Sequence, residues 1–135
     1  MQSKFNEISA KRRSIYALGD NITISPDEIF DLVKTTVRNS PSAFNSQTVR
    51  AVVLFGKNSD KVWDIVEETL QNIVKDPAAF QKTKDKIATF RAGYGTILFL
   101  TDTKIVHQLE EQFPSYADNF KDWSEQALGG AQQAV

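Results

Sequence analysis

Two apolar stretches rich in β-branched residues constrain this chain more than any other feature. Residues 48–55 are apolar on both faces, which is typical of a central strand covered on both sides. Residues 92–100 form the second stretch, and their opening Gly93-Tyr94-Gly95 permits a close approach between backbones. Helical patterns outnumber these strands, and two buried strands alone make a poor sheet. The chain therefore carries fewer strands than a self-sufficient sheet needs.

Helical patterns fill most of the remaining sequence. The clearest start is Ser25-Pro26-Asp27-Glu28, which offers an N-cap serine, a proline at the first helical position and a glutamate three residues after the cap. This helix should end at Asn39, because the residue before Pro41 is pushed out of the helical region. Further helices are predicted over residues 3–12, 60–74, 78–89, 103–112 and 117–135, with a turn at 56–60 and a turn or cap at Asp102.

The last predicted helix has two readings that the sequence leaves open. Gly129-Gly130 is a C-cap signal, so the segment after it would be a frayed tail. Alternatively, residues 117–135 form a buried helix in which the two glycines let another helix pack closely.

Length and composition exclude several classes of protein. The 135 residues predict one domain over 1–135, which can bury roughly 70% of its unfolded surface. Sixteen basic and seventeen acidic residues give a net charge of -1, so no global field attracts nucleic acid or an anionic membrane. The absence of cysteine excludes disulfides and thiolate chemistry, and it fits a cytoplasmic protein. Since the N-terminus lacks an apolar h-region and the apolar runs are short, we expect neither a secretory signal nor a membrane span.

No hydrolytic or metal-binding constellation is present in the sequence. His107 is the single histidine and lies in a charged helical pattern, where a surface position is expected. A zinc site that needs two histidines is excluded, and neither a Walker loop nor a GxGxxG is present. We therefore name no catalytic acid, base or nucleophile, and no metal ligand.

Two polar segments remain as candidates for binding. Residues 40–47 are uncharged and stiffened by Pro41, and their hydroxyl and amide groups can bind a small polar ligand through hydrogen bonds. Lys11-Arg12-Arg13-Ser14 is the only triple-basic run. Each segment also has an ordinary structural explanation. Residues 40–47 could be a connector, and the cations at 11–13 could simply stabilise the C-terminus of a helix. Brought together, a cationic group and a neutral polar loop suit a phosphorylated organic cofactor.

The two segments in tandem resemble the flavin-binding elements of the nitroreductase family. The pattern is Arg-Arg-Ser-Ile-Tyr at 12–16, then a helix, then Ser-Pro-Ser-Ala-Phe-Asn-Ser-Gln at 40–47 leading into a strand. Residues 90–96 and 123–135 also look similar to the fungal and bacterial branch of this family, which includes members linked to stress responses. The resemblance implies an α+β fold, a mainly antiparallel sheet wrapped by helices, in an intertwined homodimer. Because family members continue past Val135 into further strands, we expect a fold that is incomplete at the C-terminus.

The resemblance also implies a cofactor site for flavin mononucleotide (FMN) at the dimer interface. The residues assigned to the cofactor are Arg12, Arg13, Ser14, Pro41, Ser42, Asn45 and Gln47. Residues 12–14 would hold the phosphate and ribityl chain by charge-assisted bonds. Pro41, Ser42 and Asn45 would reach the same cofactor from the other subunit. Gln47 would fix the loop or the ring edge, and Phe44 could line the face toward a small aromatic substrate. Tyr16 stands where many relatives carry a cation, so redox tuning should differ.

The reaction implied is electron transfer from NADH or NADPH, through FMN, to nitroaromatics or quinones, with the cofactor supplying the chemistry. The alternative is a non-catalytic flavin- or lipid-binding regulatory protein on the same fold. A helical domain without a cofactor is the third reading. Steady oxidation of NADH with a nitroaromatic or quinone acceptor would separate the first reading from the second.

Overall fold

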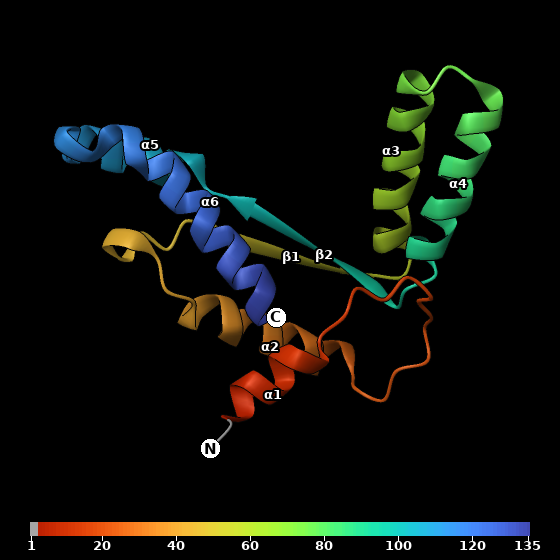
Figure 1. Ribbon diagram of the computed structural model, residues 1–135, viewed down its shortest axis with the longest axis horizontal. Coiled ribbons are helices and arrows are strands. Elements are labelled where there is room, and N and C mark those ends of the chain that lie inside the picture. Colours follow the sequence, from red (N-terminus) through yellow and green to blue (C-terminus); the bar gives the residue numbers. More distant parts are fainter. Residues whose placement is uncertain (1–2) are drawn as a thin grey trace.

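The computed structural model describes residues 3–135. The protein contains a short antiparallel two-stranded ribbon with helices on its faces and at its ends. The elements, in chain order, are α1 (Lys4–Lys11), α2 (Pro26–Asn39), η1 (Ala43–Asn45), β1 (Val49–Phe55), α3 (Lys57–Ile73), α4 (Pro77–Arg91), β2 (Gly95–Thr101), α5 (Thr103–Gln112), η2 (Pro114–Tyr116) and α6 (Ala117–Ala134). The α3–α4 hairpin and the α5–α6 pair form two arms at opposite ends of the ribbon (Figure 1). The predicted α+β class is confirmed. None of the described helices is both long and apolar enough to cross a bilayer.

The sheet of the described residues consists of β1 and β2 alone. They pair antiparallel from Val49 opposite Thr101 to Phe55 opposite Gly95. A Cβ added to Gly95 would lie 2.7 Å from the Leu54 carbonyl oxygen, so the predicted close backbone approach is confirmed.

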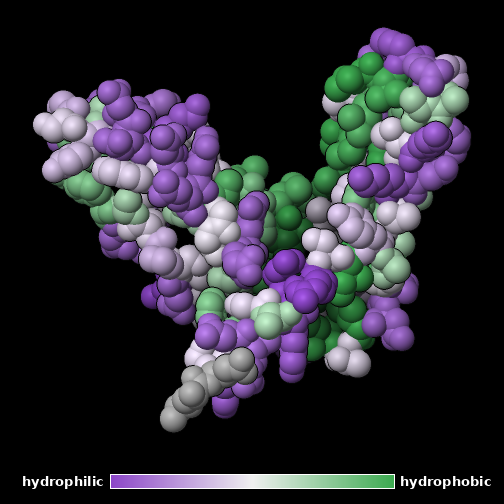
Figure 2. All heavy atoms as spheres, in the orientation of Figure 1, coloured by the Kyte–Doolittle hydropathy of each residue, from purple (hydrophilic) through white to green (hydrophobic). Residues whose placement is uncertain are grey.

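The two faces of this sheet are covered unequally. Val49 packs with Ala127 and Ala131 of α6 and with Val37 of α2, so one face is covered at this end of the strand. The other face meets α3 only near Thr96 and leaves Val52 and Leu100 exposed. The prediction that residues 48–55 are covered on both sides is therefore wrong within residues 3–135, because a second cover is present at one end only. Figure 2 shows apolar surface in the notch between the two arms.

The start of α2 agrees with the sequence in detail. The Ser25 side chain accepts the Glu28 backbone N–H at 3.3 Å, and the Glu28 carboxylate accepts the Ser25 backbone N–H at 2.8 Å. Pro26 is the first helical residue and the helix ends at Asn39, as predicted. Asp102 caps α5 by accepting the Lys104 backbone N–H, also as predicted.

Other boundaries differ by a few residues. The predicted turn at 56–60 contracts to Gly56, with φ 52°, and α3 begins directly after it at Lys57. A glycine in the left-handed region turns the chain in one step, so the polar residues that follow can start the helix. The second strand begins at Gly95 instead of Ala92, because Arg91 still belongs to α4.

At the end of the chain, α6 continues through both glycines to Ala134. The prediction of a frayed tail after Gly129-Gly130 is therefore wrong. Ala127 and Ala131 are buried, as the alternative prediction of a buried helix expected. A Cβ on Gly129 or Gly130 would meet nothing within 4 Å, so alanines and not the glycines make the close contact.

Candidate functional site

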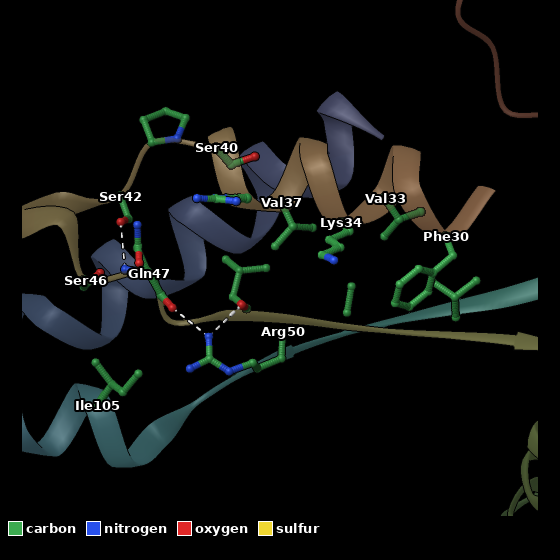
Figure 3. A pocket seen from close by; sticks show the side chains of 15 residues that line it. Phe30, Val33, Lys34, Val37, Ser40, Ser42, Ser46, Gln47, Arg50 and Ile105 are labelled. Atoms are coloured by element: carbon green, nitrogen blue, oxygen red, sulfur yellow. Dashed lines mark hydrogen bonds between the residues drawn. The ribbon is translucent and has the colours of Figure 1, made fainter. Parts of the chain in front are cut away.

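A cleft lies between α2, the loop at 40–47, the first strand β1 and the start of α5 (Figure 3). Its volume is about 400 Å³, which falls within the range of small-molecule sites. Its lining is apolar at the floor and polar or cationic at the rim. The residues are Phe30, Val33, Val37, Val49, Ala51, Val53 and Ile105, with Ser40, Pro41, Ser42, Ser46 and Gln47, and with Lys34, Arg38 and Arg50.

The loop at 40–47 holds an unusual backbone conformation. Phe44, Asn45 and Gln47 have φ of 56°, 50° and 49°, in the left-handed region that asparagine tolerates but that phenylalanine and glutamine seldom adopt. Each such residue costs about 1–3 kcal/mol and persists only where its surroundings fix it. Strained residues of this kind cluster at ligand sites, so the backbone draws attention to the same loop as its composition does.

Hydrogen bonds between residues of the loop help to hold this backbone conformation. The Ser42 hydroxyl oxygen accepts the Gln47 backbone N–H at 2.9 Å. The Ser42 carbonyl accepts the Asn45 N–H at 3.0 Å, and the Asn45 side-chain oxygen accepts the Gln47 amide at 3.4 Å. At the start of the loop, the Ser40 hydroxyl donates to the Thr36 carbonyl at 2.9 Å and continues the end of α2.

Arg50 ties the loop to two other elements. Its Nη1 donates to the Gln47 carbonyl at 2.8 Å and to the Val49 carbonyl at 3.0 Å, as the dashed lines of Figure 3 mark. Its Nη2 donates to the carboxylate of Asp102, the N-cap of α5, at 3.0 Å. The sequence analysis missed Arg50, and the available signal was a lone cation in an otherwise apolar strand.

Phe44 lies on the other side of the loop, outside the cleft lining. Phe44 is 48% exposed, and its ring belongs to an aromatic cluster that we define as Phe44, Phe113, Tyr116, Phe120 and Trp123. The centroid distances from Phe44 are 5.0 Å to Phe113, 5.6 Å to Tyr116, 5.3 Å to Phe120 and 5.8 Å to Trp123. The structure therefore places Phe44 against α6 and the turn before it, and not where it would line the cleft.

The predicted cofactor residues of the loop are divided. Pro41, Ser42 and Gln47 line the cleft, whereas Asn45 does not and instead contacts Gln47.

The predicted cationic half of the site lies elsewhere. Arg12, Arg13 and Ser14 follow α1, are exposed, and line none of the cleft. The Arg13 guanidinium donates to the Ala10 carbonyl at 2.8 Å and the Arg12 carbonyl at 2.7 Å, so it faces its own backbone. Among residues 3–135, α1 makes no extended contact with another helix or strand. One chain does not bring the two halves together, and their assignment to different subunits stays a prediction.

Comparisons with known proteins converge on one family. The family model described as "Nitroreductase family" matches residues 10–135. HBN1 of Saccharomyces cerevisiae, a protein with a nitroreductase name, is 35% identical over 125 residues, which are 90% of this chain and 60% of HBN1. The yeast nitroreductase FRM2 is 30% identical over 123 residues, with the same coverage of 90% and 60%. The chain thus spans about 60% of the length of the curated relatives it matches.

Solved structures agree with this result. Nitroreductase CinD from Lactococcus lactis, in complex with nicotinic acid, superposes with a TM-score of 0.81 at 42% identity, over 96% of this chain and 64% of CinD. CinD has also been solved with chloramphenicol and with 4-nitrophenol. A nitroreductase from Saccharomyces cerevisiae superposes with a TM-score of 0.82 at 28% identity, over 98% of this chain and 72% of that one.

Proposed function

The chain belongs to the nitroreductase family, and we propose that it forms the FMN-binding part of an oxidoreductase that takes electrons from NADH or NADPH. The acceptors proposed are nitroaromatics or quinones. The observation that carries this proposal is the strained polar loop at 40–47, held at the rim of a cleft with an apolar floor.

The chemistry of the cleft suits a flavin. A flat, largely apolar ring system matches a floor of valines and alanine, and hydroxyl and amide groups at the rim suit its polar edge. When bound, FMN would supply the two-electron chemistry that the protein side chains lack. The work of this chain would be to bind the cofactor, orient it and keep water from its apolar face.

In this proposal the two polar segments have separate roles. Arg12 and Arg13, with the Ser14 hydroxyl, would bind the phosphate through charge-assisted bonds. Pro41, Ser42 and Asn45 would contact the cofactor held by a second copy of the chain, with Gln47 orienting the ring edge.

Two features support a homodimer. The predicted halves of the site lie in separate parts of one chain. In addition, Phe5, Ile8 and Ile15, which flank Arg12, are exposed apolar side chains that a second subunit would cover.

The acceptor class rests on relatives of known structure. CinD has been solved with 4-nitrophenol and with chloramphenicol. At 42% identity over most of this chain, CinD supports a small aromatic or nitroaromatic acceptor for this protein as well.

The test is to add FMN to the purified protein, remove the excess, record the visible spectrum, and follow NADH and NADPH oxidation with 4-nitrophenol or a quinone. We expect retained flavin absorbance and acceptor-dependent oxidation. Retained flavin without turnover by either donor would favour the non-catalytic flavin-binding reading. Protein that retains no FMN would contradict the proposal.

A further inference from the structure

Phe44 combines two properties that are rarely found together. Its backbone has a φ of 56°, although phenylalanine is a bulky L-residue for which this region is a genuine outlier. Its ring nevertheless has partners from two elements and the residue that joins α5 to η2: Tyr116 in η2, Phe120 and Trp123 in α6, and Phe113. The outlier therefore sits at the point where the loop meets the rest of the chain.

The contacts of the ring are those of favourable aromatic pairs. The Trp123 ring is stacked on Phe44 with an interplanar angle of 22°, and the Phe120 ring meets it edge-on at 67°. Phe120 is only 1% exposed, so the cluster is anchored in the protein interior. Since aromatic pairs add stability beyond their buried area, the cluster can offset the backbone cost at Phe44.

We propose that Phe44 is a positioning residue whose ring, held in the aromatic cluster, fixes the loop at 40–47 in its ligand-ready conformation before any ligand arrives. Pro41, Ser42 and Gln47 line the cleft, and Figure 3 shows Ser42 and Gln47 together at its rim. The Phe44 ring, which lies between them in sequence, contacts the aromatic cluster instead. The inference rests on the proposed function only in taking FMN as the ligand of this rim.

A consequence is that cleft affinity depends on residues that do not touch the cleft. Tyr116 and Trp123 lie far after the loop in sequence and do not line the cleft, and both of their rings contact the Phe44 ring. If the ring is released, only a fraction of molecules holds the competent loop, and the apparent Kd rises in proportion.

The experiment compares three substitutions at one position with a matched control. Phe44→Ala removes the ring but keeps the backbone strain, whereas Phe44→Gly removes both. Phe44→Tyr keeps the ring. Phe55→Ala makes the same chemical change at the opposite end of β1, where Phe55 contacts Tyr94 at 5.6 Å and not the loop. Circular dichroism checks that each variant is folded.

The first readout is hydrogen exchange of the Gln47 backbone N–H, which donates to the Ser42 hydroxyl oxygen in the fixed loop. We expect exchange to quicken by roughly tenfold or more in Phe44→Ala, less in Phe44→Gly, and little in Phe44→Tyr and Phe55→Ala. The second readout is the Kd for FMN, which should rise roughly tenfold in Phe44→Ala and follow the same order.

The outcomes are separable. Unchanged Gln47 exchange in Phe44→Ala, or equally fast exchange in Phe55→Ala, would overturn the positioning role. Phe44→Gly that protects the amide as well as phenylalanine does would also overturn it, because backbone strain alone would then decide the conformation. If no form of the protein binds FMN, the proposed function fails, and the exchange data still decide the role of Phe44.

Discussion

The loop at 40–47 and the segment at 12–16 are held in opposite ways. The loop is fixed from three directions, by the Phe44 ring in the aromatic cluster, by the Ser42 hydroxyl, and by the Arg50 guanidinium. The segment at 12–16 is exposed, and within residues 3–135 the Arg13 side chain donates only to the backbone carbonyls of Ala10 and Arg12. One chain thus prepares the neutral half of the proposed site and leaves the cationic half unformed.

The difference follows from the reach of the side chains. Serine, proline and asparagine are short, so their polar atoms can meet a ligand only if the backbone is already in place. Fixing that backbone in advance removes an ordering cost from binding. An arginine has a long stem and a charged fork, so it can find a phosphate after the ligand or a partner has arrived. The strained backbone therefore lies in the loop that carries these short polar side chains.

The largest expected effect falls on the cationic side. Arg12→Ala should weaken FMN binding by about 1.5–3 kcal/mol, the range for hydrogen bonds to charged groups, and should leave the free energy of unfolding unchanged. The reason is that Arg12 is exposed and has no side-chain partner among residues 3–135. Titration with FMN and urea denaturation measure the two quantities.

Lys11→Ala is the matched control for this change, because Lys11 is the adjacent exposed cation at the end of α1. Its loss should alter neither quantity appreciably. Equal weakening of FMN binding by both substitutions would show that general charge, and not a specific contact of Arg12, attracts the phosphate.

A smaller effect is expected for the loop at 40–47, and it should appear as a lower free energy of unfolding. Arg50→Ala removes the hydrogen bond to the Gln47 carbonyl and the bond to Asp102, and should cost about 1–2 kcal/mol of unfolding free energy. The ion pair itself adds little, since its side chains are 48% and 29% exposed. Thermal or urea unfolding measures the loss.

Lys84→Ala tests whether the ion pair alone explains that loss. The Lys84–Glu67 pair has similar exposure, 53% and 30%, but Lys84 donates to no loop carbonyl. Its removal should cost less than about 1 kcal/mol. If both substitutions destabilise the protein equally, then the bond from Arg50 to the loop contributes nothing measurable.

Local signals in the sequence predicted much of this fold. The capping box at Ser25 and the proline after Asn39 set the limits of α2, because each acts through residues only a few positions apart. Both strands were found from apolar β-branched runs, and the rim of the cleft from the composition of residues 40–47. The exposed face of β1 was missed, because a doubly apolar strand does not reveal how many neighbours cover it.

The strained backbone of the loop could not be predicted from its own residues. Phenylalanine has no local preference for the left-handed region, so the conformation at Phe44 depends on Phe113, Phe120 and Trp123, far along the chain. The bond from Arg50 to Asp102 was not predicted for the same reason, since Asp102 comes from another element. Hydrogen bonds and ring contacts across elements have no periodicity in sequence.

The smallest expected effect concerns the helix that leads into the loop. Hydrogen bonds from the Ser25 backbone N–H and then the Ser25 hydroxyl lower the pKa of Glu28, against a smaller opposing effect of burial. Since the folded pKa lies below the unfolded one, this stabilisation is complete above the unfolded pKa and is lost as the pH falls through the folded pKa. Glu28→Gln keeps an acceptor for the capping box but cannot titrate. We therefore expect wild type to have a slightly higher Tm than Glu28→Gln at neutral pH, and this difference to vanish in acid. A Tm difference that does not change with pH would assign the contribution of Glu28 to the shape of the capping box and not to its charge.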